Sequence, residues 1–142
     1  MNLIQRIKEN HILAISIGLV YIWFGALKFF PSLSPAEDLA KNTIDSLTVG
    51  LIPSTVSIIV LAIWESVIGV CLLLNIYRKQ VIILALIHMF FTFSPLFFFP
   101  DLSFNSLPVG FSLVGQYIFK NLIIISALIT LYRVPIKEYS IQ

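Results

Sequence analysis

Charged residues are scarce in this chain. Of its 142 residues only 11% are Asp, Glu, Lys or Arg, whereas 58% are hydrophobic and the mean hydropathy is +0.98. A soluble domain usually carries a charged fraction of about 25%. A chain of this length cannot hide so much apolar surface from water, which excludes an ordinary soluble domain. We expect one transmembrane domain over residues 1–142, with the lipid bilayer as its solvent.

Cysteines, basic patches and catalytic motifs are scarce as well. Cys71 is the only cysteine, which excludes an internal disulfide and a CxxC redox pair. The net charge of +2 comes without a basic cluster, so we expect no nucleic-acid partner. The sequence contains no GxSxG, HExxH, Walker or GxGxxG motif. One histidine and one glutamate are too few ligands for a metal, so we predict no metal site.

The chain has four long apolar runs instead. They cover about residues 11–30, 52–76, 81–99 and 109–132. Each is long enough to cross a hydrocarbon core about 30 Å thick as an α-helix that rises about 1.5 Å per residue. The runs are continuous rather than alternating, which favours helices over the strands of a barrel. We therefore predict an all-α protein, an integral-membrane four-helix bundle.

Charges that flank the runs predict one orientation. The basic residues outside the runs gather before the first, between the second and third, and after the fourth; they are Arg6, Lys8, Arg78, Lys79, Arg133 and Lys137. The other two connecting segments hold four acidic residues, and Lys41 is their only basic residue. Because basic residues stay in the cytoplasm, we expect both termini there (N-in, C-in).

The first outer segment carries a helix start signal. Ser34-Pro35-Ala36-Glu37 combines a capping serine, a proline in the first turn and a closing glutamate. Beyond it, apolar and polar residues fall on opposite sides of a helix. This pattern predicts a short amphipathic helix, which either lies on the outer membrane surface or packs as a connecting helix on the mouth of the bundle.

Each apolar run contains one isolated ionisable side chain: Lys28, Glu65, His88 and Lys120. A charge in hydrocarbon costs at least about 2.5–3.5 kcal/mol, so such residues usually face the interior of a bundle. Each also lies on a helical stripe of small or polar residues, which lets helices approach closely. The stripes are Ala14, Gly18, Tyr21, Gly25 and Lys28; Ala62, Glu65, Gly69 and Leu72; Ala85, His88, Thr92 and Pro95; and Leu113, Gln116, Lys120 and Ala127, with Tyr117 and Asn121 beside the last.

The sequence allows more than one set of contacts among the four ionisable side chains. By depth, Glu65, His88 and Lys120 could meet near the membrane midplane, and Glu65 with Lys120 could be a purely structural ion pair. Lys28 lies near the outer end of its run, where it either snorkels to the interface or reaches inward towards Gln116. His88 could be a neutral hydrogen-bonding residue.

A polar pocket in an apolar bundle suits a ligand with an apolar body and a polar head, such as a quinone. A quinone carbonyl needs hydrogen-bond donors, and quinone reduction consumes protons, which Glu65 and His88 could relay. Gln116 and Asn121 could also serve only to join helices by hydrogen bonds. The candidate ligand-binding residues are Lys28, Glu65, His88, Gln116, Tyr117, Lys120 and Asn121; no catalytic residue is assigned.

Short motifs in a fixed order carry a family resemblance. They are Phe24-Gly25-Ala26-Leu27-Lys28-Phe29 followed by Ser34-Pro35-Ala36-Glu37, then Trp64-Glu65 with Gly69, His88 with Ser94-Pro95-Leu96, and Gly115-Gln116-Tyr117 with Lys120-Asn121. With these, and over nearly its whole length, the chain resembles the DoxX-like family of small bacterial four-helix membrane proteins. The resemblance implies a bundle in the bacterial cytoplasmic (inner) membrane. Some relatives are membrane subunits in thiosulfate:quinone oxidoreduction, and others look like membrane partners of antioxidant or sulfur-transfer enzymes.

The expected function is therefore that of an accessory subunit in a redox or detoxification system, rather than a stand-alone enzyme. It would bind a quinone-like molecule and receive electrons from a soluble or membrane partner protein. The sequence also allows a homo-oligomer. One alternative is a small proton-coupled transporter or channel that uses Glu65 and His88 as a relay. Another is a structural or assembly subunit whose charges pair only for packing.

Overall fold

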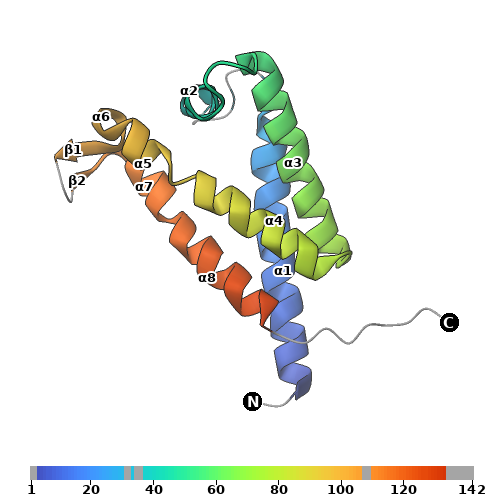
Figure 1. Ribbon diagram of the computed structural model, residues 1–142. Helices are drawn as coiled ribbons and strands as arrows, with labels where there is room; N and C mark the ends of the chain where they lie inside the picture. The colour runs from blue at the N-terminus through green and yellow to red at the C-terminus, as the bar shows by residue number, and fades with distance from the viewer. Residues whose placement is uncertain (1–2, 31–32, 34–36, 107–109, 134–142) are drawn as a thin grey trace.

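The computed structural model describes residues 3–30, 33, 37–106 and 110–133, and these residues are mostly helical (Figure 1). The elements are α1 (Leu3–Leu27), α2 (Glu37–Thr48), α3 (Ser54–Leu74), α4 (Arg78–Phe91), α5 (Pro95–Phe98), α6 (Pro100–Ser103), β1 (Phe104–Ser106), β2 (Gly110–Phe111), α7 (Leu113–Phe119) and α8 (Asn121–Tyr132). The prediction of a mostly helical chain is confirmed. The first helix starts earlier and ends sooner than the apolar run of residues 11–30.

Helices α1 and α3 run antiparallel and form the closest pair in the fold. A Cβ atom added to Gly69 would lie 2.6 Å from Cγ1 of Ile22 and 2.7 Å from the carbonyl oxygen of Gly18. A Cβ atom added to Gly25 would lie 2.7 Å from Oγ of Ser66. Glycine is therefore required at this contact, and the stripes predicted on the first two runs do face each other.

Long apolar helices carry large exposed hydrophobic side chains. Among the described residues, three helical stretches are long and apolar enough to cross a membrane: Ser54–Leu74, Arg78–Phe98 and Leu113–Tyr132. The apolar part of α1, His11–Leu27, is shorter. The core lies where α1, α3, α4 and α8 meet, while Trp23, Phe90 and Ile123 are each at least 66% exposed. Such outward surfaces are suited to lipid. The number of spanning helices and the side on which the termini lie stay predictions.

Two of the apolar runs are interrupted. The third run divides at residues 92–94 into α4 and α5, and the fourth divides at Lys120 into α7 and α8. Between α6 and α7 lies a short antiparallel hairpin of β1 and β2, which was not predicted from the sequence. The rings of Phe104 and Phe111 stack across this hairpin with their centroids 5.0 Å apart.

The amphipathic helix is present as α2, which packs on α3 and α5 (Figure 1). Glu37 and Thr43 are buried there, and Lys41 Nζ lies 2.5 Å from Glu37 Oε1. These contacts favour a connecting helix packed on the other helices over one that lies free on a membrane surface. Residues 34–36 of the start signal lie outside the described residues.

Candidate functional site

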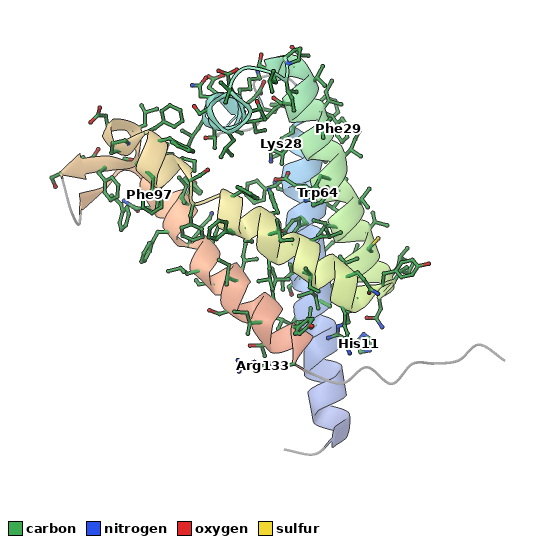
Figure 2. All side chains as sticks on the ribbon, in the orientation of Figure 1. His11, Lys28, Phe29, Trp64, Phe97 and Arg133 are labelled. Atoms are coloured by element: carbon green, nitrogen blue, oxygen red, sulfur yellow. The ribbon has the colours of Figure 1, made fainter. Side chains whose placement is uncertain are left out.

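Four side chains from three parts of the fold form a continuous line of polar contacts, here called the polar chain. Lys28 Nζ donates to Glu65 Oε2 at 2.6 Å. Glu65 Oε1 lies 3.4 Å from His88 Nε2, and His88 Nδ1 lies 3.2 Å from Tyr21 Oη. Tyr21 Oη also lies 3.2 Å from the carbonyl oxygen of Ala85. The polar chain thus joins the end of α1 to α3 and α4, and Figure 2 shows Lys28 beside α3.

The polar chain is almost entirely buried. The side chains of Lys28, Glu65 and His88 are 9%, 8% and 11% exposed. Opposite charges attract strongly in such low-dielectric surroundings, and a buried charge without a partner is costly. Lys28 Nζ also donates to the carbonyl oxygen of Phe24 at 3.2 Å, so its side chain runs back along α1. Neither sequence alternative for Lys28, snorkelling to the interface or contact with Gln116, describes this arrangement.

The polar chain forms one part of the wall of a cavity of about 520 Å³. Helices α1, α2, α3, α4, α7 and α8 all contribute to this wall, and most of it is apolar. The apolar side chains include Phe24, Leu39, Ile44, Leu61, Met89 and Ile118. The cavity therefore offers a mostly apolar volume, with the ion pair of Lys28 and Glu65 and the imidazole of His88 among the polar groups on its wall.

Six of the seven candidate ligand-binding residues line this cavity: Lys28, Glu65, His88, Tyr117, Lys120 and Asn121. The structure does not bring Gln116 to it. The Gln116 side chain is exposed, and its amide Nε2 donates to the carbonyl oxygen of Phe111 at 3.3 Å. A donor role for Gln116 in the cavity is not supported by this position.

The pairing of Glu65 is a correction to one sequence alternative. Glu65 pairs with Lys28 and not with Lys120. Lys120 is exposed, and its Nζ lies 4.1 Å from the centroid of the Tyr117 ring. Helix α7 ends before Lys120 and α8 begins after it, and the backbone of Lys120 itself stays in the right-handed helical region. Of the predicted stripe of the fourth run, Leu113, Gln116 and Lys120 are exposed, whereas Ala127 packs against the core; the buried residues of this run are Gly115, Ile118, Leu128 and Leu131.

Asn121 joins two helices at the edge of the cavity. Its Nδ2 donates to Thr92 Oγ1 at 3.3 Å, and Thr92 Oγ1 donates to the carbonyl oxygen of Met89 at 2.6 Å. An interhelical hydrogen bond was one of the two roles predicted for Asn121 from the sequence. Because Asn121 and Thr92 also line the cavity, the contact fixes part of its polar wall.

Tyr21 is the site residue that sequence reasoning missed. It lies on the first stripe, two helical turns before Lys28, and the candidate residues predicted from the sequence do not include it. Its side chain is 3% exposed, and a buried phenol normally finds a hydrogen-bond partner. That rule, applied to a tyrosine on the same stripe as a buried lysine, was the available signal.

The site can exchange protons and donate hydrogen bonds. The polar chain contains an ammonium group, a carboxylate, an imidazole and a phenol, all on the wall of one cavity. Among the described residues, no group of three or more His, Cys, Asp or Glu is placed to hold a metal ion. Cys71 is free and half-buried in the helix pair, away from the cavity wall.

Comparison with known proteins adds no relative. A scan against models of protein families, a search of curated proteins and a search of solved structures find no match to this chain. The resemblance to the DoxX-like family therefore depends on the sequence motifs alone, and the function has to be argued from the cavity and its polar chain.

Proposed function

We propose that this chain is an integral membrane protein that binds a quinone-like molecule in the cavity beside the polar chain. It would serve as an accessory subunit of a redox or detoxification system of the DoxX type in the bacterial cytoplasmic membrane, with both termini inside. The observation that carries the proposal is a largely apolar cavity of about 520 Å³ with Lys28, Glu65 and His88 on its wall. Small-molecule sites usually occupy about 300–1,000 Å³, with apolar walls and a few convergent polar groups.

The polar chain has a hydrogen-bond donor to spare for such a ligand. A lysine ammonium carries three N–H groups. Two of them serve Glu65 Oε2 and the carbonyl oxygen of Phe24. The third remains for an oxygen of a bound molecule, and the apolar side chains of Phe24, Met89 and Ile118 would contact its ring and tail. Electrons for any reduction would come from a partner protein.

Quinone binding can be measured on the whole chain in lipid nanodiscs. A short-tailed ubiquinone or menaquinone analogue is equilibrated with loaded and empty discs, and an alkylbenzene with the same tail tests the need for the carbonyl groups. We expect retention above that of empty discs for the quinone only. Equal retention by loaded and empty discs would contradict the proposal.

A matched pair of variants shows whether the polar chain is responsible. In Lys28→Met/Glu65→Gln both charges are removed together, so that no unpaired charge stays buried. A hydrogen bond to a charged group is worth about 1.5–3 kcal/mol, so affinity should fall at least about tenfold. Lys79→Met, a control at an exposed position outside the cavity, should keep the affinity. Unchanged quinone affinity in the double variant would assign the cavity no role in recognising the head group.

Proton-coupled transport is the second candidate, because Glu65 Oε1 lies 3.4 Å from His88 Nε2 on the cavity wall. It is tested by proton flux into liposomes that contain the protein and a pH-sensitive dye. Flux that is present in the wild type and lost in Glu65→Gln, without quinone binding, would favour transport. If neither flux nor binding is found, a structural or assembly role is left.

A further inference from the structure

The Tyr21 hydroxyl lies between two possible hydrogen-bond partners. Its oxygen is 3.2 Å from the carbonyl oxygen of Ala85 and 3.2 Å from His88 Nδ1. A phenol carries one hydrogen, so it can donate to only one of them at a time, although its oxygen can accept as well. Rotation about the C–O bond selects the partner, and no heavier atom has to move.

In the first arrangement Tyr21 donates to His88 Nδ1. Nδ1 is then an acceptor, and the hydrogen of the neutral imidazole is on Nε2, which points at Glu65 Oε1 over 3.4 Å. Glu65 is a carboxylate that accepts from both His88 and Lys28. Only the contact between Tyr21 Oη and the carbonyl oxygen of Ala85 is lost, and the polar chain carries no net charge.

In the second arrangement Tyr21 donates to the carbonyl oxygen of Ala85. His88 Nδ1 must then carry a hydrogen and donate it to Tyr21 Oη. Nε2 still faces Glu65 Oε1, and without a proton between them two lone pairs would oppose each other. A proton is therefore needed there, on Nε2 or on Oε1. The second arrangement holds one proton more than the first, and the polar chain has a net charge of +1.

We propose that the polar chain is a one-proton site on the cavity wall, and that Tyr21 is its positioning residue. Rotation of the Tyr21 hydroxyl between His88 Nδ1 and the carbonyl oxygen of Ala85 accompanies release and uptake of that proton. The proton is exchanged with water in the ligand-free protein, and with a protonatable oxygen of the bound molecule when the cavity is filled. The charged and titratable groups around His88 are Tyr21 and Lys28 at α1, Glu65 on α3, and Tyr117 and Lys120 across the cavity at α7.

The one-proton site requires no ligand, so it can be correct even if the proposed function is wrong. Its use as a proton donor to a quinone oxygen does rest on that function. The arrangement gives the use a physical basis, because a donor on the cavity wall that gains and loses its proton without rearrangement of the helices needs little reorganisation when it reacts.

The test is the protonation state of His88 Nδ1 in ligand-free protein. The chain has two histidines, so His11→Gln leaves His88 as the only one, and its two ring nitrogens can be followed by ¹⁵N NMR in nanodiscs. Across the pH range in which the protein stays folded, we expect Nδ1 to be protonated at the acidic end and bare at the alkaline end, with Nε2 protonated there. A Nδ1 that stays bare throughout, or that stays protonated throughout, would overturn the proposal.

Tyr21→Phe tests the role of the hydroxyl. Without it, Nδ1–H has no acceptor, and the change at Nδ1 should disappear from that pH range. Tyr132→Phe, on the exposed face of α8, should keep the change. The same Nδ1 transition in Tyr21→Phe would show that Tyr21 positions nothing.

If Tyr21→Phe does not fold, the wild type still decides. The phenol C–O band in the infrared differs between a hydroxyl that only donates and one that also accepts. We expect one tyrosine band to shift together with the Nδ1 transition, and an unshifted set of bands would contradict the switch.

Discussion

Lys28 and Glu65 are held together by their surroundings as much as by their charges. Each is at most 9% exposed at its side chain, so burial removes most of the solvation that either ion would have alone. Glu65 Oε2 accepts from Lys28 while Oε1 faces His88, so both carboxylate oxygens are engaged. Loss of one partner would leave the other charged and buried, which is the costly case for an ion pair.

The stability of three variants tests this pairing. Lys28→Met alone should lower the free energy of unfolding by about 3–5 kcal/mol, because it strands the Glu65 carboxylate. The double variant Lys28→Met/Glu65→Gln should recover most of that loss, since no charge stays buried. Unfolding in detergent with a chemical denaturant measures both. A double variant less stable than Lys28→Met would show that the charges are not coupled.

For single residues, the sequence identified the ionisable side chains of the site but not all of their contacts. Glu65 and His88 stood out because an ionisable residue is rare in a long apolar run. Lys28 was placed near the outer end of its run, and its partner depended on how α1 and α3 align. That alignment is set by contacts between glycines on two helices and by a connecting segment that contains α2, none of which a single run reveals.

Among the helices, α1 and α3 position the ion pair of the site. Their backbones meet at glycines, and that close approach brings the end of α1 beside the middle of α3, where Lys28 reaches Glu65. The predicted stripes described this pair correctly because both helices are continuous. The stripe predicted on the fourth run followed its polar residues, and three of its members, Leu113, Gln116 and Lys120, are exposed. An interruption at a single residue, Lys120, leaves no proline or glycine signal.

Gly69→Ala tests the close approach of the two helices. The added Cβ would lie 2.6 Å from Cγ1 of Ile22 and 2.7 Å from the carbonyl oxygen of Gly18, so the helices must separate. Overpacking of this kind costs about 1–3 kcal/mol. Ala26→Leu, at an exposed position of α1, adds more volume and should cost little. The free energy of unfolding of both variants is measured with a chemical denaturant. Equal values for the two variants would show that the close approach of α1 and α3 at Gly69 does not contribute to stability.

For the molecule as a whole, long apolar helices with exposed apolar side chains are the features that suit a membrane. Apolar side chains as large as Trp23 and Phe90 are exposed on the outside, and the ionisable groups of the runs line one cavity between the helices. Composition was enough to predict the apolar outer surface, whereas the position of the ionisable groups was predicted from the cost of a charge in hydrocarbon. The hairpin of β1 and β2 was not predictable in the same way, since it depends on five residues and one aromatic stack.

Orientation in the membrane is tested with single cysteines in a Cys71→Ser background. Asp45→Cys lies on α2, in a segment predicted to be outside, and Lys79→Cys lies at the start of α4, predicted to be inside. A membrane-impermeant maleimide should label Asp45→Cys in intact spheroplasts and Lys79→Cys only after permeabilisation. Both residues are exposed, so access to the thiol does not limit labelling. The reverse pattern would invert the topology.

The central claim is that the cavity beside Lys28, Glu65 and His88 holds the head of a quinone-like ligand. The most direct measurement is photo-cross-linking in nanodiscs with a quinone that carries a photoreactive group on its ring, followed by mass spectrometry of the labelled peptides. Labels are predicted on cavity residues such as Phe24, Met89 and Ile118, and an excess of unlabelled quinone should displace them. Labels confined to outward residues such as Ile63 and Phe90, without displacement, would contradict the claim.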